Sequence, residues 1–124
     1  MSDVPSHLRY TSDHEWVLAD GDSLKIGITR YAADALGDVV YVDHPAVGSS
    51  VQAGAIVGEV ESTKSVGEIF SPVTGTVVET NQAVVDDPEL INRDPYGEGW
   101  LFRVDTTDSP DLMDADAYTA LIGQ

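Results

Sequence analysis

The stretch that decides the fold is residues 55–70, Ala55-Ile56-Val57-Gly58-Glu59-Val60-Glu61-Ser62-Thr63-Lys64-Ser65-Val66-Gly67-Glu68-Ile69-Phe70. Two runs rich in β-branched and apolar residues, 55–61 and 66–70, flank the polar residues 62–65. Such runs joined by a short polar connection are typical of a β-hairpin. The sequence therefore predicts two strands with Lys64 at the tip of the turn between them.

Further strands are predicted on both sides of this hairpin. The turn-rich residues 19–23 separate two apolar runs, so a second hairpin is expected there. The strands predicted outside the lysine hairpin are 15–18, 24–28, 39–42, 76–79 and 100–104. The chain is therefore expected to be mostly β.

Helices are expected at two places. A short helix is predicted near 30–36, because Thr29 suits its N-cap and Gly37 its C-cap. A C-terminal helix is predicted within about 109–122, starting at Ser109-Pro110. Residues 81–99, rich in Asp, Pro, Asn and Gly, are expected to form a long irregular connection.

A weak internal repeat surrounds Lys64. Segments 45–51 and 72–78 share the placement of Pro, Gly and Val. A two-fold quasi-symmetric β-sandwich with the lysine turn at one end would produce this pattern. The 124 residues suit one domain, residues 1–124, with a β core of about 15–105 and the helical segment after it.

The composition excludes several functions. With 22 acidic and 6 basic residues the net charge is −16, which repels nucleic acid and anionic membranes. Partners with basic surfaces are favoured, although solubility or a salty environment explains such an excess equally well. No apolar run approaches the roughly 20 residues of a membrane helix, and the first residues resemble neither a signal nor a transit peptide. A cytoplasmic protein is expected.

The sequence offers little for catalysis or metal binding. Cysteine is absent, so disulfides, thiolate metal sites and cysteine nucleophiles are excluded. The three histidines show no His-x-x-x-His spacing, so no metal site is expected. A small hydrolase using His14 and Glu15 would lack a nucleophile motif such as Gly-x-Ser-x-Gly.

Lys64 is one of only two lysines, the other being Lys25. A lysine ε-amine can form a stable amide with a carboxylic acid cofactor, and a hairpin tip presents that arm far from the body of the protein. A rigid base with a flexible arm lets one group visit several active sites at high effective concentration. The alternative is an ordinary solvated lysine in a polar turn.

The surroundings of Lys64 resemble a known family. Residues 59–65, followed by Ser71-Pro72-Val73-Thr74-Gly75, resemble the biotinyl/lipoyl attachment hammerhead, a barrel-sandwich hybrid of two antiparallel sheets. Further segments narrow the resemblance, from about residue 8 to about 121, to the H proteins of the glycine cleavage system. These segments are Tyr10-Thr11-Ser12-Asp13-His14-Glu15-Trp16, Ile26-Gly27-Ile28-Thr29, Ala35-Leu36-Gly37-Asp38-Val39-Val40, Pro88-Glu89-Leu90-Ile91-Asn92 and Asp94-Pro95-Tyr96-Gly97-Glu98-Gly99-Trp100.

The resemblance implies a non-catalytic carrier with lipoate joined to Lys64 through an amide. The lipoyl arm would shuttle an aminomethyl group from the decarboxylating glycine dehydrogenase (P protein) to the aminomethyltransferase (T protein). Dihydrolipoyl dehydrogenase (L protein) would reoxidise it, and a lipoate or octanoate transferase or ligase would load it. A monomer with weak interfaces suits a carrier that serves several enzymes in turn.

The resemblance also implies a cleft in which the loaded arm docks, at Asp13, Glu15 and Glu68. Carboxylates suit such a cleft, because a nearby acid favours the cationic form of the loaded amine. Shielding from water would slow loss of the cargo. The alternative is that all three are ordinary surface acids.

Three other carriers share parts of this pattern. Biotin carriers usually flank the lysine with methionines, where this chain has Thr63 and Ser65. Lipoyl domains of 2-oxo acid dehydrogenases usually have Asp before the lysine and Ala after it. An octanoyl or lipoyl relay for those complexes is compatible with the H-protein pattern and stays an alternative.

Overall fold

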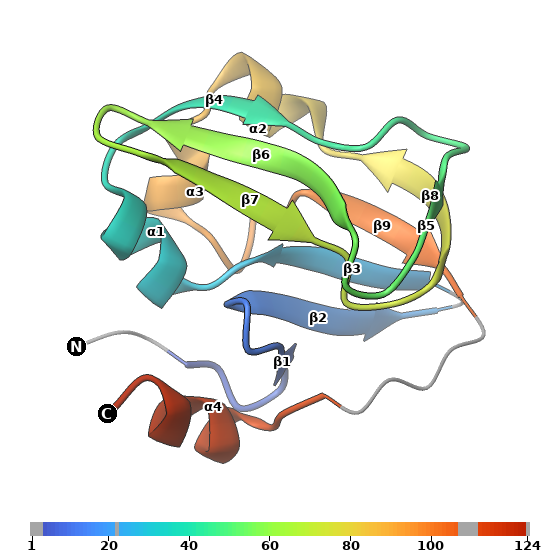
Figure 1. Cartoon of the computed structure of the whole chain (residues 1–124), viewed down its shortest axis with the longest axis horizontal. Helices are drawn as coiled ribbons and strands as arrows, with labels where there is room; N and C mark the ends of the chain where they lie inside the picture. The colour runs from blue at the N-terminus through green and yellow to red at the C-terminus, as the bar shows by residue number, and fades with distance from the viewer. Residues whose placement is uncertain (1–3, 22, 107–111, 124) are drawn as a thin grey trace.

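A computed structural model describes residues 4–21, 23–106 and 112–123, and there it shows two antiparallel sheets packed face to face (Figure 1). The larger sheet has the strand order β1-β2-β3-β9-β8-β5 and the smaller sheet β4-β6-β7. The strands are β1 (Arg9–Tyr10), β2 (Glu15–Asp20), β3 (Ser23–Ile28), β4 (Val39–Asp43), β5 (Ser50–Val51), β6 (Ile56–Ser62), β7 (Val66–Phe70), β8 (Gly75–Thr80) and β9 (Phe102–Asp105). The mostly-β prediction is confirmed, and in the described residues the two sheets do not close into a barrel.

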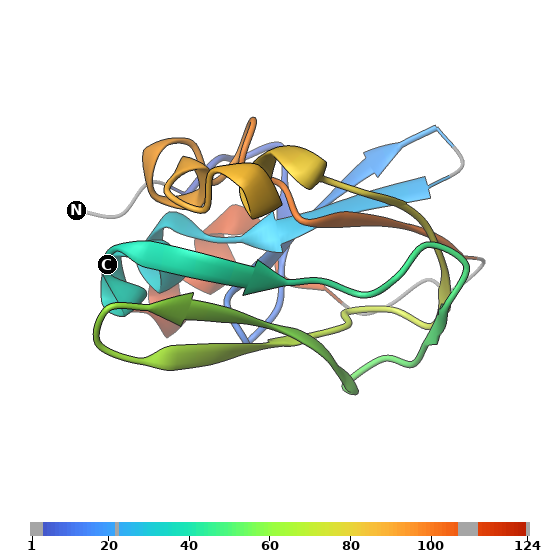
Figure 2. The same ribbon diagram turned by 90° about the horizontal axis from the view of Figure 1, so that it is seen from above.

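Both predicted hairpins form. Strands β2 and β3 pair from Glu15↔Ile28 to Asp20↔Ser23. Strands β6 and β7 pair from Ile56↔Phe70 to Glu61↔Val66. The β6–β7 turn lies beside helix α1, at the opposite end of the molecule from β5 and the β5–β8 pairing (Figures 1 and 2).

Helix α1 (Arg30–Leu36) has the predicted caps. The Thr29 side chain accepts a hydrogen bond from the Ala32 N–H at 3.2 Å. Gly37 ends the helix at φ 86°, a left-handed conformation that glycine adopts without a Cβ penalty, and its N–H donates to the Ala33 carbonyl at 3.1 Å.

The prediction that residues 81–99 form a long irregular connection is wrong. Two short helices lie there, α2 (Gln82–Asp86) and α3 (Leu90–Arg93), anchored by the fully buried Val84 and Ile91. The Asn81 side chain caps α2 by accepting from the Ala83 N–H at 3.2 Å. Helices of five and four residues span little more than one turn, so they leave almost no 3.6-residue periodicity in the sequence.

Helix α4 (Ala115–Leu121) follows an Asp114 cap, whose Oδ1 accepts from the Ala117 N–H at 2.8 Å. The predicted start at Ser109-Pro110 lies outside the described residues. Tyr118 of α4 stacks on Tyr10 of β1 with ring centroids 4.7 Å apart, which fixes the helix to the edge of the larger sheet. No helix in the described residues has the length and apolar character needed to span a membrane.

The two sheets bury a shared core. Its fully buried members include Ile26, Val60, Ile69, Val77 and Val104. Each such side chain contributes about 1.5–3 kcal/mol when removed from water. A second cluster joins β1, β2 and α4 around Leu8, Tyr10, Trp16 and Tyr118. Trp16 is fully buried, and its indole N–H donates to the Pro95 carbonyl at 2.8 Å.

The two repeated segments lie side by side. Strand β5 pairs with β8 through Ser50↔Thr76 and Val51↔Gly75. The Gly48 N–H also donates to the Val77 carbonyl at 2.7 Å. Segments 45–51 and 72–78, which are similar in sequence, are therefore also neighbours in the fold.

Candidate functional site

The turn between β6 and β7 carries Lys64, as the sequence predicts. The Ser62 N–H closes the turn by donating to the Ser65 carbonyl at 2.8 Å. The Ser62 hydroxyl oxygen accepts from the N–H groups of Lys64 (3.3 Å) and Ser65 (3.0 Å). The Ser62 side chain thus replaces water at two turn amides, which fixes the backbone that carries the lysine.

A second contact ties this turn to the α1–β4 connection. The Thr63 N–H donates to the Asp38 carbonyl at 3.1 Å. A Cβ added at Gly37 would lie 3.4 Å from Lys64 Cε, so the lysine stem passes close over this glycine. The backbone at residue 64 is held from two sides, whereas its side chain is exposed.

The two lysines differ in their surroundings. In the part of the chain that the structure describes, the Lys64 ammonium has no hydrogen bond or ion pair. Lys25 is half-buried on β3, and its Nζ lies 5.6 Å from the centre of the Trp100 ring. A cation placed over an aromatic face is attracted to it. Of the two lysines, Lys64 is therefore the more exposed.

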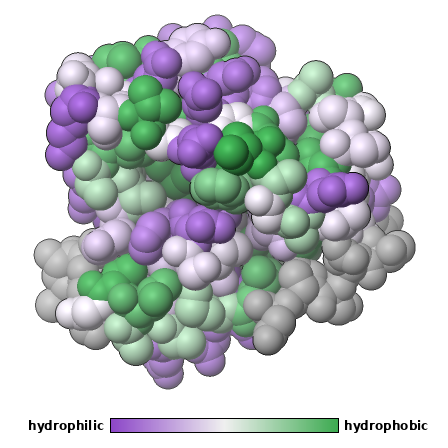
Figure 3. All heavy atoms as spheres, viewed as in Figure 1, coloured by the Kyte–Doolittle hydropathy of each residue, from purple (hydrophilic) through white to green (hydrophobic). Residues whose placement is uncertain are grey.

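An apolar groove of about 200 Å³ lies between α1 and the β6–β7 hairpin. Its hydrophobic wall consists of Ile28, Ala32, Ala35, Leu36, Val60, Gly67 and Ile69, and the polar residues Asp13, His14 and Glu68 complete its lining. The groove begins within three residues of Lys64, at Gly67 on β7. Figure 3 shows this side of the molecule, where hydrophobic and hydrophilic residues interleave.

A second hollow, the polar pocket, lies on the other side of Asp13. It encloses about 420 Å³ and is lined by Tyr10, Thr11, Ser12, Asp13, Glu15, Gly54, Ser71, Pro72, Leu112 and Met113. Asp13 therefore borders both hollows. Glu15 borders only the polar pocket, and Glu68 borders only the apolar groove.

Glu15 is a buried carboxyl group, only 1% exposed. Its Oε2 accepts from the Phe70 N–H at 3.0 Å, and its Oε1 accepts from the Thr11 hydroxyl at 2.9 Å. Burial raises the pKa of Glu15 to about 7. The two hydrogen bonds lower this pKa, and the charge of Asp13 raises it by a smaller amount. This carboxyl therefore loses its proton at a much higher pH than an ordinary glutamate.

The structure does not bring the three predicted acids into one hollow. Asp13 lines both hollows, but Glu15 lines only the polar pocket and Glu68 only the apolar groove. A role of these acids toward a docked arm stays a prediction.

Sequence reasoning missed a network behind the groove. The Tyr118 hydroxyl lies 2.7 Å from Thr29 Oγ1 and 2.8 Å from His14 Nδ1. His14 has φ 67°, an uncommon backbone conformation for a residue with a side chain. Burial lowers the pKa of His14, although the charge of Asp13 acts to raise it. Burial also raises the pKa of Tyr118 to about 12. A tyrosine so distant in sequence gives no local signal of such a contact.

Within 4–21, 23–106 and 112–123, no three His, Asp or Glu side chains gather as metal ligands would. The arrangement offers instead an exposed amine on a fixed turn beside an apolar groove.

Comparisons with known proteins agree with this arrangement. The family model described as glycine cleavage H-protein matches residues 8–124. The glycine cleavage system H protein of Clavibacter sepedonicus is 56% identical over 124 residues, covering 100% of both chains. That of Thermobifida fusca is 56% identical over 119 residues, covering 95% of this chain and 94% of its own.

A solved structure shows the same fold. The crystal structure of a glycine cleavage system H protein from Mycobacterium marinum has a TM-score of 0.92 and 46% sequence identity. The match covers 98% of this chain and 100% of that one. The chain therefore belongs to the glycine cleavage H-protein family, the non-catalytic lipoyl carriers of the glycine cleavage system.

Proposed function

We propose that Lys64 is the residue that carries lipoate, through an amide to its ε-amine. The observation that carries this proposal is an exposed lysine on a turn fixed by Ser62 and by the Asp38 carbonyl. The only other lysine, Lys25, packs against Trp100. A fixed backbone with a free side chain is what a swinging arm requires.

The apolar groove fits the hydrocarbon part of such an arm. Its wall of Ile28, Leu36 and Ile69 would exclude water from a docked arm, and Gly67 leaves room where a side chain would meet Leu36. When bound, the lipoyl group supplies a disulfide that accepts an aminomethyl group. The chain itself binds, orients and shields.

Acidic residues beside the groove suit a cationic cargo. Asp13 lines the groove, so an amine docked there would lie near its negative charge. Glu68 borders the groove from the edge strand β7, with its side chain on the face of the sheet that Glu59 also occupies. Glu15, adjacent to Asp13, adds a carboxyl that ionises near pH 7 and takes on full charge more readily beside a cation. Asp13 would favour the protonated form of the loaded amine while the groove keeps water away, and Glu15 in the polar pocket and Glu68 on β7 would add negative charge from outside the groove.

The partners in this proposal are the decarboxylating glycine dehydrogenase, the aminomethyltransferase and dihydrolipoyl dehydrogenase, with a lipoate or octanoate transferase or ligase for loading. The outer face of β4-β6-β7 supports docking on basic surfaces. Asp43, Glu59 and Glu68 are exposed and lie opposite one another across the three strands. Like charges placed directly opposite are destabilising, and a basic partner surface would relieve that repulsion.

Intact mass measurement tests the attachment. The chain is incubated with a lipoate ligase, lipoate and ATP, then digested to map the adduct. We expect one lipoyl adduct on Lys64, no adduct on Lys64→Arg, and a normal adduct on the matched control Lys25→Arg. An adduct on Lys25, a biotinyl adduct in cells, or full support of glycine cleavage by Lys64→Arg would contradict the proposal.

A further inference from the structure

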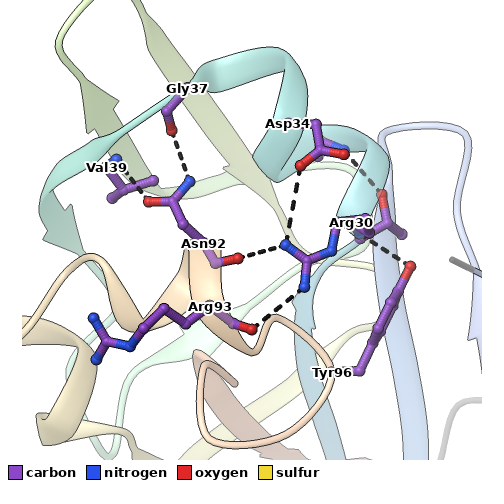
Figure 4. Close-up of polar contacts among 9 residues, drawn as sticks. Arg30, Asp34, Gly37, Val39, Asn92, Arg93 and Tyr96 are labelled. Atoms are coloured by element: carbon purple, nitrogen blue, oxygen red, sulfur yellow. Dashed lines mark hydrogen bonds and ion pairs between the residues drawn. The ribbon is translucent and has the colours of Figure 1, made fainter. Parts of the chain in front are cut away.

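Asn92 connects a distant helix to the turn beneath Lys64. It lies on α3, and its side chain bridges the α1–β4 connection (Figure 4). Its Nδ2 donates to the Gly37 carbonyl at 2.8 Å, and its Oδ1 accepts from the Val39 N–H at 2.9 Å. Both hydrogen-bonding groups of the amide are thus used on one short stretch of backbone.

Residues 37–39, to which the Asn92 side chain is hydrogen-bonded, also contact the lysine turn. Between Gly37 and Val39 lies Asp38, whose carbonyl accepts from the Thr63 N–H at 3.1 Å. Gly37 itself lies under the Lys64 stem. A continuous path of contacts therefore runs from α3 through residues 37–39 to the backbone next to Lys64.

Asn92 is itself held firmly in place. The Arg30 guanidinium donates to the Asn92 carbonyl and, at 3.4 Å, to the Arg93 carbonyl. The Arg30 N–H donates to the Tyr96 hydroxyl at 3.0 Å (Figure 4). Helix α3 is thereby fixed to the first residue of α1, so the Asn92 amide acts from a rigid base.

We propose that Asn92 is a positioning residue for lipoate attachment, holding the 37–39 connection so that it presents the Lys64 turn in one orientation. This inference rests on the proposed attachment at Lys64. An attaching enzyme must bind the turn before it reacts with the amine. A turn that is already ordered binds more tightly, because less conformational freedom is lost on binding. Loss of Asn92 should therefore weaken capture of the carrier and leave the chemical step intact.

Asn81 provides a matched control. It is also an asparagine that bridges backbone groups, with Nδ2 donating to the carbonyls of Glu98 and Trp100, both at 2.7 Å. Its Oδ1 accepts from the Ala83 N–H at 3.2 Å. Because these hydrogen bonds of the Asn81 side chain go to residues 83, 98 and 100 and not to 37–39, Asn81→Ala should lower overall stability without loosening the lysine turn.

The first readout is amide hydrogen exchange, measured by NMR on the unmodified chain below its unfolding temperature. In Asn92→Ala the Thr63 amide should exchange about tenfold faster, the effect of losing a hydrogen bond or two. The Ser62 amide, bonded to Ser65 within the turn, should change little. Asn81→Ala should leave the Thr63 amide as it is in the wild type.

The second readout is lipoate attachment by a ligase over a range of carrier concentrations. For Asn92→Ala we expect a KM about five- to tenfold higher and a kcat within about twofold of the wild type. For Asn81→Ala both constants should stay near the wild-type values. Unchanged attachment and exchange in Asn92→Ala would overturn the inference, and so would equal effects in the two variants. A wild-type chain that gains no adduct on Lys64 would instead refute the proposed function, and Thr63 exchange would still decide whether Asn92 braces the turn.

Discussion

Glu15→Gln offers a quantitative test of the buried carboxyl beside the polar pocket. Glutamine has nearly the same shape and cannot ionise. Its amide oxygen can still accept from the Phe70 N–H. The substitution therefore removes the charge and keeps the packing of a side chain that is 1% exposed.

The magnitude follows from the pKa of Glu15, which rises from 4.5 to about 7 on folding, mainly through burial. The folded chain holds this proton more tightly than the unfolded chain. The stability of the wild type therefore falls as the pH rises from about 4.5 to about 7, and above pH 7 this contribution stays constant. Between pH 5 and pH 8 the loss amounts to about 2–3 kcal/mol, at about 1.4 kcal/mol for each pKa unit. Glu15→Gln lacks this loss.

Urea unfolding followed by tryptophan fluorescence, at pH 5 and at pH 8, measures the effect. The difference in stability between variant and wild type isolates the contribution of the Glu15 charge, including its coupling to the charge of Asp13. That difference should shift by about 2–3 kcal/mol in favour of the variant on going from pH 5 to pH 8. A difference that is the same at both values would show that Glu15 has an ordinary pKa and would refute the reasoning.

The same variant tests the proposed role toward the cargo. If Glu15 adds negative charge near a docked amine, Glu15→Gln should release the loaded aminomethyl group faster, although the fold is as stable or more stable at pH 8. Release is followed by mass spectrometry of the loaded carrier. An unchanged release rate would confine Glu15 to a structural role.

Two further predictions concern the groove and the network behind it. A Cβ at Gly67 would lie 3.2 Å from Leu36 Cδ2, so Gly67→Val should fill the groove. The loaded arm should then lose its cargo several-fold faster while lipoate attachment stays normal, and an unchanged rate of loss would contradict docking there. Tyr118→Phe leaves Thr29 Oγ1 and His14 Nδ1 without the hydroxyl that they contact. It should lower the free energy of unfolding by about 1–3 kcal/mol, and an unchanged urea midpoint would show that water replaces the hydroxyl at no cost.

Local patterns in the sequence predicted the parts of the fold that local physics decides. The lysine hairpin was visible because two β-branched runs flank a polar turn, and α1 because Thr29 and Gly37 occupy its two caps. Helices α2 and α3 were missed, since one turn of helix stabilised by a single buried residue leaves no periodicity. Tertiary packing, and not local preference, makes those residues helical.

The candidate site was predictable only where a motif lies within one segment. Lys64 could be chosen from its own surroundings in the sequence. Whether Asp13, Glu15 and Glu68 line one cleft could not be predicted from a single segment, because the shape of a cleft depends on how separate strands pack. The sequence places Asp13 and Glu15 two residues apart, yet β2 buries Glu15 and leaves Asp13 exposed. The contacts of Asn92 with Gly37 and Val39 are likewise invisible before the chain is folded.

The charge distribution around Lys64 is as informative as its position. In a chain with 22 acidic residues, Arg30, Arg93 and Arg103 each pair with a carboxylate. In the described residues the Lys64 ammonium pairs with none, as is also true of Arg9 and Lys25. Its turn neighbours Ser62, Thr63 and Ser65 are uncharged. An ion pair there would hold the amine protonated and tie down its stem, and both effects oppose amide formation. The acidic residues on the outer face of β4-β6-β7 can therefore take part in docking without forming an ion pair with the Lys64 amine. This separation requires that the turn keeps its orientation, and Ser62 and Asn92 hold it there.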